Sequence, residues 1–460
     1  MQIKEIKENY EKLLGKKVNL NGWIKNHRKQ KNFGFIDLSD GSSFKNLQIV
    51  YDEAIENFDE VQTFKHDSSI NIEGIIIKSE GKNQVFEIKA ESVNLLGDNT
   101  EDYPMQPKRH SMEFLREQAY LRPRTNLFRA VFRIRSTASF LIHEYFQNRN
   151  YVYLNAPIIT ASDAEGAGEM FNVTILDYNN LPKDENGNVD YSKDFFESKA
   201  NLTVSGQLQA ETFATSFGRT YTFGPTFRAE NSNTKIHAAE FWMIEPEVAF
   251  ANLDDILEVE EDVLKYVING ILEKCSDEMK FLDSFVKKGL IKQLKEVANS
   301  SFARITHKEA IDILINSGNK FDFKPVQGED LAKEHERYLT DEYFKKPVFV
   351  TDWPKDIKAF YMKVNGDGKT VAAADLLVPF LGELIGGSQR EENYDVLKKR
   401  MNDMNVDVLE LEWYLNLRKY GTCVHSGFGI GFERLLIYLT GIENIRDVIA
   451  FPRTPGSCEF

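Results

Sequence analysis

Cysteine is nearly absent from this chain of 460 residues, which contains only Cys275, Cys423 and Cys458. No two of them have the spacing of a metal-binding pair or of a disulfide framework, so the sequence predicts no structural zinc and a reducing compartment. Long hydrophobic runs are missing as well. The strongest candidate, residues 371–381, is interrupted by Asp375 and is much shorter than the roughly 20 apolar residues that span a bilayer. We therefore expect a cytoplasmic protein with no membrane partner.

Positive charge is also in the minority, because 57 Lys and Arg face 71 Asp and Glu, for a net charge of −14. This does not exclude a nucleic-acid partner, since phosphate binding depends on the local field and not on the sum. Residues 25–31 hold a local basic cluster that is either a solvated turn between strands or part of an RNA-binding surface. Residues 1–7 are charged and lack the apolar core of a signal peptide.

Short runs rich in Val, Ile and Phe fill the first hundred residues, and turn-forming pieces such as residues 40–43 separate them. Five short strands in a small unit predict an OB-type β-barrel, a fold that often binds single-stranded nucleic acid. We place this domain at residues 1–97 and a polar hinge or linker at residues 98–125. The predicted strands are 18–24, 33–38, 44–51, 70–77 and 84–95.

The remaining residues, 126–460, are interpreted as one α+β domain. Apolar side chains recur at steps of three and four from Leu127 to Tyr145, which predicts a helix with one apolar stripe. Aromatic-rich strands then alternate irregularly with helices, which favours an antiparallel sheet flanked by helices. A helix-rich insertion covers roughly 276–346, and we find no motif for catalysis or binding in it. The main predicted strands are 219–223 and 241–248, and the main predicted helices are 254–274 and 394–404.

Two strands joined by a polar loop, at residues 227–230 and 240–247, can project an arginine and a carboxylate into one cleft. The guanidinium of Arg228 can hold a phosphate oxygen bidentately, and the carboxylate of Glu230 can accept from an adenine amine. The ring of Phe241 could stack on the purine. This is a candidate ATP site.

A glycine-rich segment at residues 427–431 leads into a predicted helix, with Arg434 in its first turn. The glycines permit tight backbone at a strand-to-helix junction. Alone, the glycine pattern is weak evidence for a nucleotide site, and an arginine at a helix start is usually a surface charge.

In order and spacing, the helix ending before Pro157, the Arg228 segment and the Arg434 segment resemble the three signature motifs of class II aminoacyl-tRNA synthetases. These motifs follow an OB-like domain, and this arrangement is similar to that of the subgroup that contains the aspartyl, asparaginyl and lysyl enzymes. The resemblance covers essentially the whole chain. It implies an antiparallel catalytic sheet, a homodimer formed through the first motif, and ATP bound in a bent form with Mg²⁺.

The resemblance assigns roles at the ATP site to seven residues, among which Arg228, Arg434 and Glu383 act in catalysis. Glu383 would hold Mg²⁺ as a hard oxygen ligand, and Asp375 is a weaker candidate because its spacing to Glu383 is one residue too long. In relatives an arginine directly precedes the loop histidine, whereas this chain has Ile236 at that place. One phosphate contact would therefore be missing here, unless the side chain of Lys235 reaches in. The ATP-binding candidates are Arg228, Glu230, His237, Phe241, Glu383, Gly431 and Arg434.

Within the subgroup the chain is more similar to asparaginyl than to aspartyl members. Ala210 stands where aspartyl relatives carry a lysine that pairs with the substrate carboxylate, and an unpaired buried charge costs several kcal/mol. Glu245 could accept from an asparagine amide and would repel aspartate. Arg390 would donate to the side-chain carbonyl. By resemblance the amino-acid-binding residues are Glu165, Ser205, Gln207, Glu245 and Arg390.

Three barrel residues fall where anticodon-reading residues sit in relatives: Arg28, Phe35 and Gln48. Phe35 would stack on a base and Gln48 would bind the central uridine; the alternative for Phe35 is a place in the barrel core. The implied activity is an ATP-dependent ligase that loads L-asparagine onto tRNA(Asn). The alternatives are an aspartyl enzyme of relaxed specificity, a paralogue that amidates aspartate, and a tRNA-binding protein without catalysis.

Overall fold

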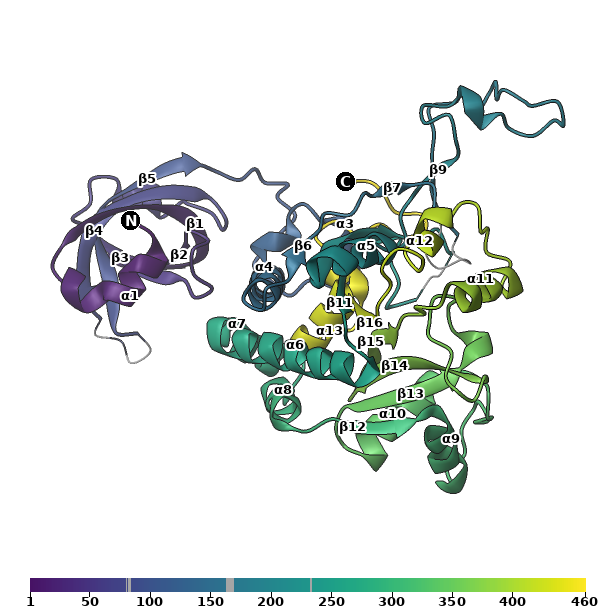
Figure 1. Ribbon diagram of the computed structural model, residues 1–460. Helices are drawn as coiled ribbons and strands as arrows, with labels where there is room; N and C mark the ends of the chain where they lie inside the picture. Colours follow the sequence, from purple (N-terminus) through teal and green to yellow (C-terminus); the bar gives the residue numbers. More distant parts are fainter. Residues whose placement is uncertain (80, 82–83, 163–168, 232–233) are drawn as a thin grey trace. The chain divides into compact units, whose positions relative to one another are not determined.

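The chain folds into two compact units, Met1–Ala130 and Val131–Phe460, each of which is visible in Figure 1. The predicted linker at residues 98–125 is grouped with the first unit. Within that unit the Tyr103 hydroxyl donates to the Asp67 carboxylate at 2.5 Å. The computed structural model describes all residues except 80, 82–83, 163–168 and 232–233.

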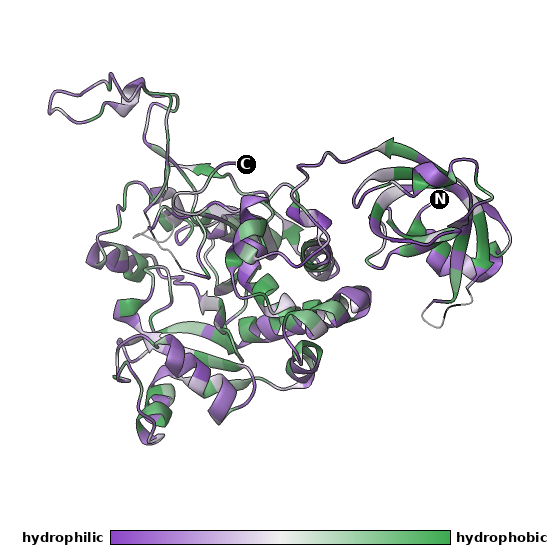
Figure 2. Cartoon of the chain, turned by 180° about the vertical axis from the view of Figure 1, so that it is seen from behind, coloured by the Kyte–Doolittle hydropathy of each residue, from purple (hydrophilic) through white to green (hydrophobic). Residues whose placement is uncertain are grey.

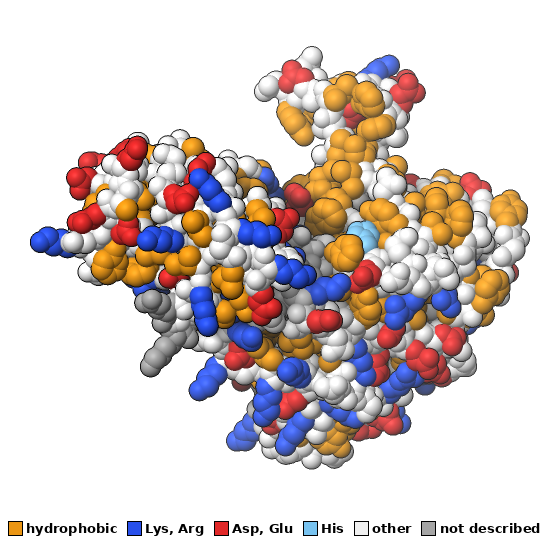
Figure 3. Space-filling model, turned by 90° about the vertical axis from the view of Figure 1, so that its left-hand side faces the viewer, with side chains coloured by type: hydrophobic (Ala, Val, Ile, Leu, Met, Phe, Trp, Pro, Cys, Tyr) orange, Lys and Arg blue, Asp and Glu red, His pale blue; other side chains and the backbone are white. Residues whose placement is uncertain are grey.

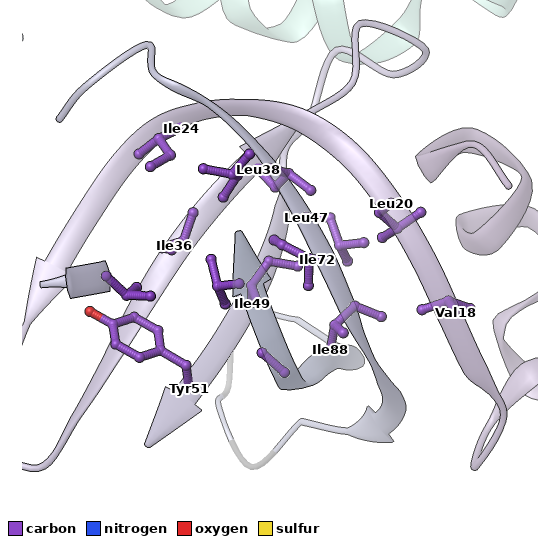
Figure 4. Close-up of a cluster of buried hydrophobic side chains, with 14 of the residues drawn as sticks. Val18, Leu20, Ile24, Ile36, Leu38, Leu47, Ile49, Tyr51, Ile72 and Ile88 are labelled. Atoms are coloured by element: carbon purple, nitrogen blue, oxygen red, sulfur yellow. The ribbon is translucent and has the colours of Figure 1, made fainter. Parts of the chain in front are cut away.

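Five strands close into a barrel in the first unit, which confirms the predicted OB-type fold. Alternation explains its core: in β2, Ile36 and Leu38 are fully buried, whereas Phe35 and Asp37 are partly exposed. Figure 4 shows the aliphatic side chains of these strands meeting inside the barrel. In barrel order the strands are β1 (Lys17–Lys29), β2 (Phe33–Ser39), β3 (Leu47–Asp52), β5 (Phe86–Gly97) and β4 (Ser69–Lys78).

An eight-stranded sheet forms the centre of the second unit. Its inner pairs are antiparallel, as predicted, whereas the outermost pair at each edge of the described sheet, β12 with β13 and β10 with β6, is parallel. The strands of this sheet are mostly hydrophobic in Figure 2. In sheet order they are β12 (Ala303–Thr306), β13 (Val348–Pro354), β14 (Thr370–Val378), β15 (Gly382–Gln389), β16 (His425–Gly431), β11 (Glu240–Ala249), β10 (Arg219–Phe227) and β6 (Val152–Tyr153).

Helices flank this sheet, as the sequence predicts. The periodic segment that begins near Leu127 is a 22-residue helix, and its apolar stripe contains the buried Val131, Ile134 and Leu141. The glycine-rich segment is a strand that passes directly into a helix, β16 into α13. The helices used below are α4 (Asn126–Gln147), α5 (Gln207–Phe217), α6 (Leu253–Lys274), α11 (Tyr394–Asp403), α12 (Glu412–Asn416) and α13 (Phe432–Thr440).

The region at 276–346 is rich in helix, as expected, and it also supplies the edge strand β12, which the sequence analysis did not predict. The helix at its end packs beside β15, the strand that begins with Gly382 and Glu383. The helices of this region are α7 (Ser276–Phe285), α8 (Leu290–Asn299), α9 (His307–Asn316) and α10 (Lys333–Arg337).

An arm projects from the second unit between β8 (Asn172–Val173) and β9 (Ala200–Leu202), and Figure 1 shows it extending away from the sheet. Ile175 and Tyr178 on this arm are 72% and 77% exposed. Figure 3 shows hydrophobic side chains over the arm and around its base. Among the described helices none is long and apolar enough to cross a membrane.

Candidate active site

A cavity of about 340 Å³ opens over the middle of the eight-stranded sheet. Its volume falls in the range of small-molecule sites. Strands β11, β14, β15 and β16 form its wall together with the start of α13. The predicted site residues that line it are Ser205, Gln207, Arg228, Glu230, His237, Phe241, Glu245, Asp375, Glu383, Arg390, Gly431 and Arg434.

Strand β11 supplies one wall, because alternate residues of a strand point to the same side. Phe241, Met243 and Glu245 therefore all face the cavity. The Glu245 carboxylate is 5% exposed and is held by donors from two elements. The backbone N–H of Gly206 donates to it at 2.9 Å and the hydroxyl of Thr222 at 3.0 Å, with the Ser205 hydroxyl as a third, close donor.

The start of α5 forms the same end of the cavity. Gln207 is the first residue of this helix, and its side-chain amide donates to Glu211 at 3.2 Å. Glu211 is fully buried and also accepts from Arg418 and His425, at 2.8 and 2.9 Å. Ala210 on this helix is fully buried too. The amide of Gln207 is thus fixed from behind by a buried ion cluster.

Arg390 lines the cavity and is only 3% exposed, so its guanidinium is a buried charge. Its guanidinium makes two bonds to the Glu247 carboxylate, of which the one from Nε is 3.2 Å, and a third bond of 2.7 Å to the Ser388 hydroxyl. A Cβ on Gly427 would lie 2.1 Å from Glu247, so only glycine fits there. The charge of Arg390 is therefore matched by a carboxylate behind the cavity wall.

Replacing Glu247 with alanine should lower the free energy of unfolding by about 3–5 kcal/mol, because it leaves the buried guanidinium of Arg390 without its carboxylate. Chemical denaturation of the full chain, followed by circular dichroism, measures the change. The matched control is Asp403→Ala, which breaks an exposed pair with Lys399 and should cost at most about 1 kcal/mol. Equal losses for the two variants would contradict the assigned strength of the buried pair.

Arg228 and Arg434 reach the same cavity from different elements. Arg228 directly follows β10, where its backbone N–H donates to the carbonyl of Ala239 at 2.9 Å, and its guanidinium lies 5.5 Å from the ring centre of Phe241. Arg434 lies in the first turn of α13, as predicted, and its Nη1 is 3.4 Å from Glu383. The side chain of Arg434 thus lies at the Glu383 end of the cavity.

Glu383 and Asp375 both point one oxygen at the same place. A Cβ added to Gly386 would lie 3.4 Å from Glu383 Oε1 and 3.6 Å from Asp375 Oδ1. The second oxygen of Asp375 accepts from Lys358 at 2.6 Å, and burial raises the pKa of Asp375 to about 6 even though Lys358 opposes the shift. Among the described residues no group of three or more His, Cys, Asp and Glu is arranged around one point. Mg²⁺ needs only one or two carboxylates when phosphates complete its shell, so this pair fits the ion.

The loop before β11 closes the Arg434 end of the cavity. His237 lines it and its Nδ1 is 2.6 Å from the Thr234 hydroxyl; burial and then the charge of Arg434 lower the pKa of this histidine. Ile236 also lines the cavity, so an apolar side chain occupies the place where an arginine is expected. Lys235 does not reach in: its ammonium is 3.3 Å from Glu443, and both side chains are exposed.

Several contributors carried no signal in the sequence. Lys358 and Tyr361 line the cavity although neither lies in a motif. Glu433 fixes the first turn of α13 by accepting from Arg135 at 2.8 Å and from the Trp242 backbone at 2.9 Å. These partners are far apart in the chain, which is why spacing alone could not reveal them. The predicted amino-acid ligand Glu165 lies outside the described residues.

The three predicted anticodon residues lie side by side on the barrel surface. The guanidinium of Arg28 donates to Gln48 at 2.6 Å and lies 4.9 Å from the ring centre of Phe35. The amide of Gln48 donates in turn to Glu87, also at 2.6 Å. Because Phe35 faces outward from β2, it lies outside the barrel core, and the core interpretation is wrong. A partly exposed aromatic ring beside a guanidinium is suited to stacking on a base.

Comparison with known proteins gives a consistent result. Residues 111–455 match the family model described as tRNA synthetases class II (D, K and N), and residues 18–96 match the OB-fold nucleic acid binding domain. The chain is 60% identical to the asparagine–tRNA ligase of Clostridium acetobutylicum, over 97% of this chain and 96% of that protein. It is 59% identical to that of Acholeplasma laidlawii over the full length of both.

A solved structure agrees with these relatives. The asparaginyl-tRNA synthetase of Pyrococcus horikoshii, complexed with asparaginyl-adenylate, superposes with a TM-score of 0.86 at 32% identity and covers 100% of this chain and 99% of that one.

Proposed function

The chain belongs to the class II tRNA synthetases of the D, K and N group, and from this premise we propose that it activates L-asparagine with ATP and loads it onto tRNA(Asn). One observation carries the choice of amino acid. At the end of the cavity near α5, the carboxylate of Glu245 faces inward, and the cation of Arg390 is already paired with Glu247. An amide side chain suits this end better than a carboxylate, which Glu245 would repel.

The reaction has two steps. First the α-carboxylate oxygen of asparagine attacks the α-phosphorus of ATP; a new P–O bond forms, the bond to the leaving pyrophosphate breaks, and asparaginyl-adenylate results. Then the 3′-terminal ribose hydroxyl of tRNA attacks the carbonyl carbon of the adenylate, its proton is lost, and AMP leaves. Neither step needs a strong acid or base from the protein, because placing the reactants and neutralising phosphate charge supply most of the catalysis.

The residues divide along the cavity by chemistry. Arg228 serves the α-phosphate, Phe241 stacks on adenine, and Glu230 accepts from the adenine amine. Arg434 serves the γ-phosphate, with His237 and the backbone at Gly431 beside it. When bound, Mg²⁺ neutralises charge on the phosphate oxygens, and Glu383 with Asp375 would hold it. Arg434 bonds to Glu383 at 3.4 Å, which supports the grouping of cation and metal ligand at one end.

The amino-acid end is built from β11, from the start of α5 with the residues just before it, and from the residue that follows β15. Glu245 accepts from the asparagine amide, and Arg390 donates to the side-chain carbonyl. Ser205 and Gln207 complete this end, and Glu165 binds the α-amino group. The three donors around Glu245 support its role, because they keep the carboxylate in place and leave about one of its roughly four acceptor sites for the substrate.

Purified protein with ATP and labelled pyrophosphate, supplied with either asparagine or aspartate, tests this function. We expect exchange of pyrophosphate into ATP with asparagine and at least about 100-fold less with aspartate. The reason is that Arg390 is already paired with Glu247, so no free cation is left for a substrate carboxylate at this end. Equal use of both amino acids would leave the ligase and remove its proposed specificity. No exchange with either would contradict the activity itself.

We also propose that the barrel binds the anticodon loop through Arg28, Phe35 and Gln48. Replacing Phe35 with alanine should weaken aminoacylation at low tRNA concentration by about 5- to 150-fold, the value of one stacked base. The same variant should keep its asparagine-dependent pyrophosphate exchange in the absence of tRNA, because Phe35 lies in the other unit. Comparing KM for tRNA with the exchange rate measures both. A parallel loss of exchange would contradict this assignment.

We propose further that the protein works as a homodimer in the cytoplasm. Exposed aromatic side chains near the first motif support an interface there: Phe140 on α4 is 60% exposed and Tyr153 on β6 is 43% exposed. The ring of Tyr153 lies 5.2 Å from that of His143, one helical turn from Phe140 on α4, and exposed apolar patches of this kind mark protein contacts. Sedimentation equilibrium of the wild type and of Phe140→Asp tests the interface.

A further inference from the structure

Helix α10 packs directly against the strand that carries Glu383. The carboxylate of Glu336 accepts from the backbone N–H of Glu383 at 3.2 Å. Gly382, the residue before it, has φ +89°, and a Cβ there would lie 2.1 Å from Glu336 Oε2. No larger residue fits between them. The contact therefore fixes α10 at the phosphate end of the cavity, although the sequence of this region showed no chemistry.

Lys333 lies on the same face of α10 as Glu336, because residues three apart in a helix are neighbours. Its side chain is exposed and is not part of the cavity wall, but its four-carbon stem gives the ammonium reach. The protein around its stem shields the ammonium in part, and this partial desolvation lowers the pKa of Lys333. The charges of Glu336, Arg434 and then Glu383 act on this pKa next. The ammonium of Lys333 also contributes to lowering the pKa of His237.

Two other cations of this end already have carboxylate partners. Arg434 contacts Glu383, and Lys358 is paired with Asp375. Lys235 in the neighbouring loop pairs with Glu443 outside the cavity, and Ile236 presents an apolar side chain to it. A leaving pyrophosphate gains charge as it departs and needs positive charge nearby.

We propose that Lys333 is a further phosphate-binding residue, whose ammonium binds the β- and γ-phosphates of ATP and the pyrophosphate that leaves. The inference rests on the proposed function and extends its phosphate site to the region at 276–346. Lys333 keeps its proton throughout and forms no covalent bond; it neutralises charge that Arg434 alone would leave unmatched. Glu336 acts as a positioning residue, since it ties the helix to the backbone of Glu383.

Lys333→Ala should weaken equilibrium binding of ATP about tenfold, as the loss of one charge-assisted contact would. It should leave the binding of AMP unchanged, because AMP lacks the β- and γ-phosphates. The KM for asparagine should stay as in the wild type, and Lys333→Arg should retain most of the ATP affinity. Isothermal titration with each nucleotide measures the two affinities. Lys235→Ala is the matched control and should bind both nucleotides normally.

A second variant separates a phosphate contact from a structural effect. Ile236→Arg brings a new cation to the cavity wall next to His237, so it should restore ATP binding in the Lys333→Ala background and add little in the wild type. Such non-additivity is expected of residues that share one ligand group. Equal gains in both backgrounds, unchanged ATP binding in Lys333→Ala, or an equal loss of AMP binding would overturn the proposal. Absent exchange by the wild type would instead contradict the proposed function.

Discussion

Replacing Arg228 with alanine should slow asparagine-dependent exchange of pyrophosphate into ATP by about 100- to 1000-fold, the typical loss when one donor to a developing oxyanion is removed. The guanidinium lies in the cavity wall beside Phe241, and its backbone is anchored between strands, so it is placed before substrate arrives. Such preorganised charge acts most strongly where charge grows during the reaction, here on the α-phosphate.

The split between kcat and KM makes this prediction specific. Because the charge on the α-phosphate develops in the transition state, most of the loss should fall on kcat, with a smaller rise in KM for ATP. Arg304→Ala, which breaks an exposed pair with Asp254, is the control and should exchange at the wild-type rate. Near-normal exchange by Arg228→Ala would remove Arg228 from its assigned role.

Changing Glu245 to glutamine should lower kcat/KM for asparagine by about 100-fold or more, because buried polar groups would be left unpaired. Three donors point at this carboxylate: the hydroxyls of Ser205 and Thr222 and the backbone N–H of Gly206. A glutamine cannot accept from all of them and from the substrate amide, since one of its two terminal groups is itself a donor.

The KM for ATP should change little in this variant, because Glu245 lies at the end of the cavity away from Glu383 and Arg434. The ratio of asparagine to aspartate use should fall, since the charge that repels aspartate is gone. Glu240→Gln on the same strand lies outside the cavity wall and serves as control. If Glu245→Gln kept wild-type kcat/KM and selectivity, the carboxylate would not read the side chain of the substrate.

The predicted anticodon residues Arg28, Phe35 and Gln48 show why strand register mattered more than composition. From the sequence, Phe35 suits both the barrel core and a stacking platform, because it stands in an apolar run. The antiparallel register pairs Phe35 with Arg28 on β1, and Ile36 turns inward. A shift of one residue would reverse both faces, and only the closed barrel selects one register.

The metal candidates show the limit of spacing in the same way. From their separation in the chain, Asp375 is only a weak candidate to share a metal ion with Glu383. In the pairing of β14 with β15 the register shifts between Leu376 and Leu377, so that Leu376 pairs with Ile385 and Leu377 with Glu383. The two carboxylates then meet over Gly386. A bulge is a local backbone event that the side-chain pattern does not reveal.

The sequence by itself determined the barrel, the strand-to-helix junction before Arg434 and the residues of the nucleotide motifs, since alternation, turn residues and motif order are local properties. The tertiary structure decided which charges are paired. Two ion pairs join segments that lie far apart in the chain: Arg390 with Glu247, and Asp375 with Lys358. The hydrogen bond from the backbone of Glu383 to α10 joins distant segments in the same way. A buried charge is tolerated only beside its partner, and only the fold brings those partners together.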